Sequence, residues 1–385
     1  MEEERKRPTD FSKGLEGVIS NTTRIGYVDG VAGKLSYRGY AIEDLAAYST
    51  YEETVCLLLN GNLPTRSELG KFADHLTALR GIPDEVLSRI THLPCPCHPM
   101  SLLRSGISLL ECIDETCRIA DELPEKKEAG IRLIAQMATL TAAIARHREG
   151  KEPVAPDPSL PHGANFLYML RGNRAEPLEE RVMDLCLILH ADHGMNASTF
   201  AAMVVASTLS DLHSAVSAGI STLKGPLHGG ANERVIRMLT GIASPAEAET
   251  FVEKALAKKT KIMGFGHRVY KTYDPRARIL QRYAKELTAL TGNKPLFEIA
   301  RTLEQRVTKA YGEKGIFPNV DFYSGLVYHS LGIEGSLFTP IFAVSRIAGW
   351  VARILEYLED NRLFRPRAVY DGPKDLPYLP IEKRG

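Results

Sequence analysis

The strongest constraint on the fold is a nearly continuous succession of helix signals from Gly39 to Asn361. Apolar residues recur at helical spacing, and capping residues, prolines or glycines mark the helix ends. Residues 178–189 and 198–223 are too uniformly apolar for surface helices, so we expect them at the centre of the core. No convincing β-alternation interrupts this stretch. The sequence therefore predicts a mainly α fold.

The two ends of the chain have a different pattern. Residues 24–28 and 34–38 are β-prone, and Asp29, Gly30 and Gly33 between them favour turns, which predicts short N-terminal β-hairpins. Three prolines in the last dozen or so residues indicate an extended tail.

Composition excludes several classes of protein. A chain of 385 residues suggests two domains, and a net charge of +1 gives no electrostatic reason to expect binding to nucleic acid or an anionic membrane. Six cysteines are too few for a disulfide scaffold. No uninterrupted apolar stretch is long enough to span a membrane, and the charged N-terminus lacks the apolar region of a signal peptide. We expect a soluble, cytoplasmic protein.

The glycine-rich segments do not match nucleotide-binding motifs. A dinucleotide fingerprint at Gly264-Phe-Gly266 would need a further glycine where Val269 stands and a preceding strand, and it has neither. The segment from Lys224 to Asn232 is not followed by the Gly-Lys-Ser/Thr of a phosphate-binding loop.

Two clusters are candidates for metal binding. His190 and His193 have the spacing that places two imidazoles on one helix face, and residues 92–98 include His92, Cys95, Cys97 and His98. Neither cluster has a matching second ligand pair, and prolines stiffen the second. We therefore favour a protein without a metal, and keep a metal-binding helical protein as the rival hypothesis.

Three histidines share a more suggestive setting. His193, His228 and His267 each lie at a glycine-flanked break beside a predicted helix end. Small residues let a substrate approach the backbone, and loops on a rigid helical frame often carry chemistry. The pattern predicts a site but does not name its reaction.

The segment from Gly264 to Arg276, Gly-Phe-Gly-His-Arg-Val-Tyr-Lys-Thr-Tyr-Asp-Pro-Arg, resembles the signature segment of the citrate synthase family. Residues 189–196, 224–232 and 318–325 resemble three further blocks of that family, in the same order. Arg346 and Arg365 complete the set. The resemblance covers nearly the whole chain from Gly14 onward.

This resemblance implies a mainly helical homodimer of two-domain subunits. Residues 1–223 and 327–385 would form a large domain, and residues 224–326 a small one that closes over the active site. The implied enzyme is an acyltransferase of the tricarboxylic acid cycle that condenses acetyl-CoA with oxaloacetate and hydrolyses citryl-CoA to citrate and CoA. It would use no metal and no cofactor, because the coenzyme A thioester is a substrate.

The resemblance also assigns roles to individual residues. Asp321 would be the base, His228 the donor to the thioester oxygen, and His267 the group that polarises the ketone. The expected oxaloacetate ligands are His193, supported by His190, together with Arg276, Arg346 and Arg365, the last contributed to the partner subunit's site. Fork-shaped guanidinium groups suit a dianion. The expected CoA contacts are Lys261, Ile262, Met263, Gly264, Phe265 and Lys271.

Two alternatives stay open within this resemblance. A 2-methylcitrate synthase, which uses propionyl-CoA, would share these motifs, because one methylene changes binding in an apolar pocket by only about 1–3 kcal/mol. A catalytically inactive homologue that serves as an interaction module is the other, although the intact set of His228, His267 and Asp321 argues against it.

Overall fold

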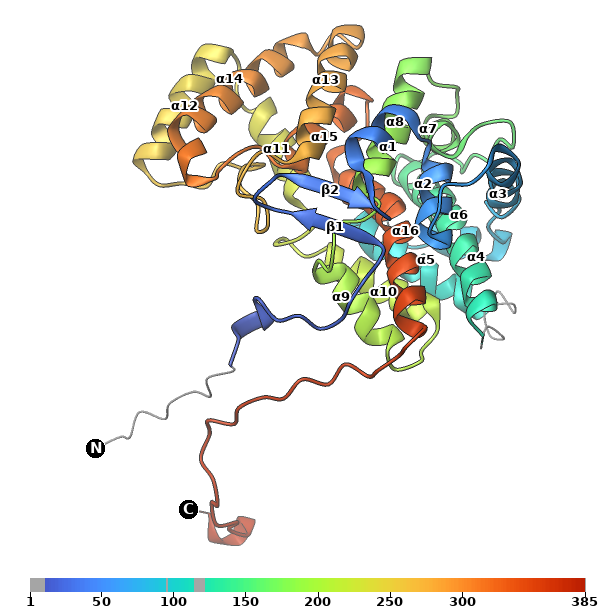
Figure 1. Cartoon of the computed structure of the whole chain (residues 1–385), viewed down its shortest axis with the longest axis vertical. Helices are drawn as coiled ribbons and strands as arrows, with labels where there is room; N and C mark the ends of the chain where they lie inside the picture. The colour runs from blue at the N-terminus through green and yellow to red at the C-terminus, as the bar shows by residue number, and fades with distance from the viewer. Residues whose placement is uncertain (1–10, 95, 114–121, 385) are drawn as a thin grey trace. The chain divides into compact units, whose positions relative to one another are not determined.

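Sixteen α-helices and one small antiparallel sheet form the part of the chain that the structure, a computed structural model, describes: residues 11–94, 96–113 and 122–384 (Figure 1). The predicted mainly α fold is therefore confirmed. Residues 23–362 form one compact unit, and the two terminal segments form another. Each unit is described by itself.

The sheet confirms the predicted hairpin. Strands β1 (Gly26–Asp29) and β2 (Lys34–Tyr37) pair antiparallel, with Gly26 opposite Tyr37 and Asp29 opposite Lys34, and the short β3 (Tyr40–Ala41) pairs with β2. The turn between β1 and β2 packs tightly on a distant segment. A Cβ at Gly30 would lie 2.1 Å from the carbonyl oxygen of Val269, and the Gly30 carbonyl accepts a hydrogen bond from the Lys271 amide at 2.8 Å.

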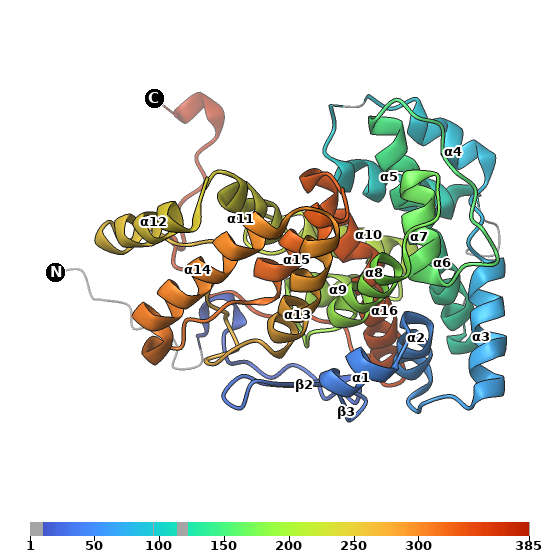
Figure 2. The same ribbon diagram turned by 90° about the horizontal axis from the view of Figure 1, so that it is seen from above.

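One group of helices surrounds the long, buried α16 (Phe338–Leu358), in which all residues from Phe338 to Ile354 are buried. The other members of this group are α1 (Ile42–Tyr48), α2 (Tyr51–Asn60), α3 (Arg66–Ala78), α4 (Asp84–Thr91), α5 (Pro99–Ile113), α6 (Leu123–Arg148), α7 (His162–Arg171), α8 (Pro177–His190), α9 (Ala197–Ala206) and α10 (Leu212–Leu223). Helices α6, α8, α9 and α10 pack on α16, which runs through the middle of the group in both views (Figures 1 and 2).

The expectation for residues 198–223 was only partly right. Their apolar run forms two helices, α9 and α10, rather than one, because Leu209 adopts a left-handed φ of 66° and Asp211 starts a new helix by accepting a hydrogen bond from the Ser214 amide at 2.7 Å. These helices are also less buried than α16. Phe200, Val204 and Val205 of α9 are partly exposed in the single chain.

A second group of helices follows in the sequence: α11 (Ala231–Thr240), α12 (Pro245–Ala257), α13 (Pro275–Leu290), α14 (Lys294–Tyr311) and α15 (Val320–Ser330). They pack mainly on one another, α12 on α14 and both α11 and α13 on α15, and lie together in both views (Figures 1 and 2). Their starts follow from local chemistry. Ser244 and Asp274 each accept a hydrogen bond from the first turn of the helix, and a proline follows each of them.

The terminal unit contains residues 11–22 and 363–384 among those described. Residues 363–380 contain neither helix nor strand, as the prolines predict, and Val369, Tyr370, Leu376 and Tyr378 are exposed apolar or aromatic residues in this tail. Arg365 belongs to this unit.

Among the described residues, one helical stretch, Gly335–Leu358, is long and apolar enough to cross a membrane by length and composition alone. Its apolar window is entirely buried within the protein, so its apolarity is explained by its place in the core.

Candidate functional site

The end of α8 and the loop after it carry two of the predicted histidines. His190 is fully buried, its Nδ1 donates to the carbonyl of Cys186 at 2.8 Å, and burial lowers its pKa to about 3. The chain then turns at Gly194, where φ is 61°, and Asn196 caps α9. His193 therefore lies on a short loop between two helix ends, buried to 8% exposure.

His228 lies in a tight turn just before α11, as the sequence predicts. The turn is closed by a hydrogen bond from the His228 amide to the Gly225 carbonyl at 2.9 Å. The ring Nε2 accepts a hydrogen bond from the Ser198 amide at 3.2 Å and lies 2.8 Å from the Ser198 hydroxyl. An N–H donor aimed at Nε2 leaves the proton of the neutral ring on Nδ1. Burial, and then the charge of Arg346, lower the pKa of His228 to about 4, so the ring is neutral at pH 7.

The segment that contains His267 pairs with the chain just before α15. Phe265 forms a bridge with Pro318, the Gly266 amide donates to the Phe317 carbonyl at 2.9 Å, and the Asn319 amide donates to the Gly264 carbonyl at 2.9 Å. Gly264 has a φ of 81°, and a Cβ there would lie 2.8 Å from side-chain atoms of Phe322 and Val235. This position therefore requires glycine.

His267 is held in one tautomer by its own loop. Its Nδ1 accepts hydrogen bonds from the amides of Val269 at 3.0 Å and Tyr270 at 3.2 Å. Two donors at Nδ1 place the proton of the neutral ring on Nε2. Burial, and then Arg276, lower the pKa of His267 to about 4, which keeps the ring neutral. His267 can therefore donate one hydrogen bond from Nε2.

Asp321 lies in the first turn of α15. Asn319 caps this helix by accepting from the Asp321 amide at 3.1 Å, and its side-chain amide also donates to the Gly266 carbonyl at 2.9 Å. The Asp321 side chain is partly buried, and its Oδ1 is buried with no hydrogen-bond partner among the described residues. Burial raises the pKa of Asp321 to about 6, against the opposing effect of Arg276. An unpartnered carboxylate with a raised pKa is suited to accept a proton.

Arg276 and Arg346 are buried cations. Arg276 makes a bidentate ion pair with Asp274, at 3.0 Å and 2.8 Å, and the same carboxylate accepts from the Val320 amide at 3.2 Å. Arg346, on α16, donates from Nε to the His190 carbonyl at 2.6 Å and stacks over the Phe342 ring at 4.7 Å. Burial lowers the pKa of Arg346 to about 10, so it remains charged at neutral pH.

The buried arginines influence the pKa values of the other predicted site residues. The charges of Arg276 and Arg346 both act on His193 and Asp321; Arg346 also acts on His228, and Arg276 on His267. The rings of His193 and His267 are 5.1 Å apart. The fold thus gathers three neutral imidazoles, a carboxylate of raised pKa and two buried cations from the two groups of helices.

Other predicted residues are placed less closely. Arg365 belongs to the terminal unit, whose position relative to this site is not defined. Lys261 is exposed and Met263 partly exposed, whereas Ile262 and Phe265 are buried and Phe265 packs on Phe322 with ring centroids 4.7 Å apart. Lys271 is exposed.

The metal hypothesis gains no support. Within the described ranges, no group of three or more His, Cys, Asp or Glu side chains is arranged to hold a metal ion. His190 and His193 bond to different partners, Cys186 and Tyr270. Cys95 lies outside the described residues, so the cluster at 92–98 is described only in part.

A shallow groove of about 300 Å³ lies near the site but is separate from it. It runs between the hairpin turn and α13, and Thr272, Tyr273, Arg278 and Arg282 are among its lining residues. None of the predicted catalytic residues line it.

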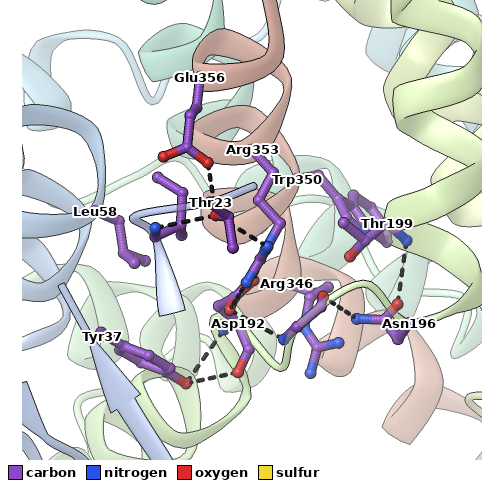
Figure 3. A network of polar contacts seen from close by, with 12 residues as sticks. Thr23, Tyr37, Leu58, Asp192, Asn196, Thr199, Arg346, Trp350, Arg353 and Glu356 are labelled. Carbon is purple, nitrogen blue, oxygen red and sulfur yellow. Dashed lines mark hydrogen bonds and ion pairs between the residues drawn. The ribbon is translucent and has the colours of Figure 1, made fainter. Parts of the chain in front are cut away.

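The sequence interpretation missed three supporting residues. Ser198 contacts His228, and Asp192 forms an ion pair with Arg353 that links the His193 loop to α16 (Figure 3). The only local indication that Asp192 matters is its position between His190 and His193, two histidines that the sequence singled out. The partners of these residues are 30 and 161 positions away.

The chain is similar to known proteins over nearly its whole length. The family model "Citrate synthase, C-terminal domain" matches residues 14–367. A citrate synthase of Deinococcus radiodurans is 46% identical over 377 residues, covering 98% of this chain and all of that protein. A citrate/2-methylcitrate synthase of Bacillus subtilis is 41% identical over 366 residues, covering 94% of this chain and 97% of that one.

A solved structure is similar over nearly its whole length. It is the ternary complex of carboxymethyl coenzyme A and oxaloacetate with the citrate synthase of Thermoplasma acidophilum, with a TM-score of 0.92, 38% identity, and coverage of 97% of this chain and 100% of that one. The match of the family model to most of the chain, together with these full-length relatives, shows that the chain belongs to the citrate synthase family.

Proposed function

We propose that this chain is a citrate synthase, which condenses acetyl-CoA with oxaloacetate and hydrolyses the resulting citryl-CoA to citrate and CoA. One observation carries the proposal. Asp321 has a raised pKa, and its Oδ1 has no hydrogen-bond partner among the described residues. We place it in one site with the neutral rings of His228 and His267. Within the same described residues, Nδ1–H of His228 and Nε2–H of His267 have no protein acceptor, so both can donate to a substrate.

The first step removes a proton from the methyl group of the thioester. Because this carbon is a very weak acid, a base alone does not ionise it usefully at neutral pH, and the developing enolate needs a hydrogen-bond donor. The Asp321 carboxylate takes the proton, while Nδ1–H of His228 donates to the thioester oxygen. A neutral imidazole suits this role, and the pKa of about 4 keeps it neutral.

The second step forms the carbon–carbon bond. The methyl carbon attacks the ketone of oxaloacetate, and the ketone oxygen gains negative charge. Nε2–H of His267 polarises this oxygen and transfers its proton to it. Water then hydrolyses the thioester of citryl-CoA, releasing CoA as the thiol and leaving citrate.

The charges of the site suit oxaloacetate. Arg276 and Arg346 supply buried positive charge for its two carboxylates, and His193 lies beside His267. We propose that Arg365 of the partner subunit adds a third guanidinium. For CoA we propose contacts with residues 261–265 and Lys271, of which Lys261, Met263 and Lys271 are the side chains open to solvent.

We also propose a homodimer of two-domain subunits. The partly exposed apolar residues of α9 in the single chain support a partner on that face. The mutual packing of α11–α15 supports a small domain spanning residues 224–326, with residues 1–223 and 327–385 forming the large one. A cytoplasmic location is part of the same proposal and fits the burial of Gly335–Leu358, the one helical stretch among the described residues that is long and apolar enough to cross a membrane.

The identity of the acyl group, acetyl or propionyl, is a separate part of the proposal. The Bacillus subtilis relative named for both citrate and 2-methylcitrate keeps propionyl-CoA as the second candidate, at lower identity than the relative named for citrate alone.

The test is oxaloacetate-dependent release of free thiol, run in parallel with acetyl-CoA and propionyl-CoA. We expect release with both substrates present and a higher kcat/KM for acetyl-CoA. A higher kcat/KM for propionyl-CoA would assign the 2-methylcitrate reaction instead. No release from folded dimer would contradict the proposed enzyme.

A further inference from the structure

Tyr270 contacts two of the site histidines at once. Its side chain is 1% exposed, and its ring lies 4.9 Å from that of His267 and 5.4 Å from that of His193. The two imidazoles are 5.1 Å apart, so the three rings form a closed triangle.

The backbone of Tyr270 acts on His267. Its amide, with that of Val269, donates to Nδ1 of His267 and leaves the ring proton on Nε2. This contact belongs to the loop and does not depend on the tyrosine side chain.

The hydroxyl of Tyr270 acts on His193. It lies 3.1 Å from Nε2 of His193, and within the described ranges this is the only hydrogen bond of the hydroxyl. A buried phenol normally donates its proton to an acceptor, and burial raises the pKa of Tyr270, which keeps the proton on the oxygen. The pKa of His193 lies well below its ordinary value because of burial and then Arg276, so the ring is neutral and its Nε2 is free to accept.

We propose that Tyr270 is a positioning residue that holds two neighbouring site histidines in opposite tautomers, His267 with its proton on Nε2 and His193 with its proton on Nδ1. Each ring then offers one N–H donor to a substrate rich in oxygen acceptors, from a different ring atom. In the opposite tautomer, a ring would present a lone pair where it now presents a donor. The functional consequence rests on the proposed role of these histidines in oxaloacetate binding; the tautomers themselves do not.

The test of the tautomers is ¹⁵N NMR of the full-length protein labelled at histidine, without substrate. The two ring signals are assigned by their loss in His193→Gln and His267→Gln. We expect a protonated Nε2 in His267 and a protonated Nδ1 in His193. A protonated Nε2 in His193 of the unmodified protein would overturn the proposal, whether or not a variant of Tyr270 folds.

Tyr270→Phe removes the hydroxyl and keeps the ring and the backbone amide. We expect the His193 signals to change toward a mixture of tautomers while the His267 signals stay in place. Tyr48→Phe is the matched control, because Tyr48 is 87% exposed. Unchanged His193 signals in Tyr270→Phe would also overturn the proposal.

Oxaloacetate binding gives the functional readout. In Tyr270→Phe we expect the affinity for oxaloacetate, measured by calorimetry, and its KM to weaken about 3- to 10-fold, as for loss of one neutral hydrogen bond, with a smaller change in kcat. An unchanged affinity contradicts the proposed role in binding. Absence of thiol release by the unmodified protein would reject the citrate synthase proposal instead, and would leave the tautomer result standing.

Discussion

Asp192 and Arg353 form a bidentate ion pair in the protein interior, with Oδ1 2.7 Å from Nε and Oδ2 2.8 Å from Nη2. Their side chains are 0% and 2% exposed. Asp192 precedes His193 in the loop after α8, and Arg353 lies two turns after Arg346 on α16 (Figure 3). The ion pair therefore fixes the loop of one proposed oxaloacetate ligand against the helix of another.

Arg353→Met should lower the free energy of unfolding by about 3–5 kcal/mol, because it leaves the Asp192 carboxylate buried without its partner cation. Denaturant unfolding at fixed protein concentration measures this change. Arg24→Met is the matched control: Arg24 pairs with Glu359 at 2.6 Å, but their side chains are 71% and 54% exposed, so we expect a loss of about 0–1 kcal/mol. Equal losses in the two variants would contradict the structural role of the buried pair.

Asp321→Asn should lower kcat by about 10²- to 10⁴-fold, the usual contribution of a positioned base. Oxaloacetate binding should be nearly unchanged, because the buried cations Arg276 and Arg346 remain. Thiol release at saturating substrate and calorimetry with oxaloacetate measure the two effects, with the exposed Asp360→Asn as control. A loss of oxaloacetate affinity with turnover retained would show that Asp321 is not the base.

The pH dependence of kcat/KM should report the same carboxylate. Burial raises the pKa of Asp321 to about 6, and a base must be ionised, so activity should rise with pH through about 6 with the slope of one proton. His228 and His267 have pKa values of about 4, so neither gains a proton in this range. If kcat/KM instead fell only as pH dropped through about 4, with the uptake of two protons, the loss of activity would be assigned to the histidines.

Asp321→Asn should also make the protein more stable at pH 7. The pKa of Asp321 is raised from 3.8 to about 6 in the folded state, so the folded protein holds this proton more tightly than the unfolded chain does. The free energy of unfolding therefore decreases as pH rises from about 4 to about 6. Removing the charge should restore about 1–2 kcal/mol above pH 6, because a shift of about two pH units corresponds to at most about 3 kcal/mol and partial exposure screens it. Thermal unfolding at pH 7 and pH 4 checks this; a gain of equal size at both would show another cause.

The sequence predicted those parts of the fold that local chemistry determines. Ser244-Pro245 and Asp274-Pro275 mark helix starts because a side-chain oxygen can accept from an amide in the first turn, and the structure has helices there. The break between α9 and α10 escaped notice because apolar residues lie on both sides of it and Leu209, at a positive φ, is not a usual turn residue. Apolarity alone did not reveal which helix forms the core.

In the candidate site, too, local sequence segments predict some features and long-range contacts determine the others. His228, His267 and Asp321 stand in recognisable segments, but their tautomers and pKa values depend on contacts that form only in the folded chain. Ser198 bonds to His228 from another helix, and nothing near either residue in the sequence indicates it. The ion pair of Asp192 with Arg353 joins positions 161 residues apart, so no local pattern predicts it.

The proposed contribution of Arg365 to the partner's site can be tested by mixing two inactive variants. Arg365→Ala lacks the guanidinium that we expect to reach the partner, and Asp321→Ala lacks the base within its own subunit. In a mixed dimer, one site would combine an intact Asp321 with the intact Arg365 of the other subunit, whereas the second site would lack both. Random exchange of equal amounts should therefore restore about a quarter of the unmodified activity in a two-fold symmetric dimer.

Subunit exchange itself must be measured, by differently tagged subunits that co-purify after mixing. Recovery of activity that follows the appearance of mixed dimers supports a site shared across the interface. If Arg365 acted within its own subunit, each subunit of a mixed dimer would still carry one defect, and no activity would return. Mixed dimers without activity would therefore assign Arg365 to the site of its own subunit.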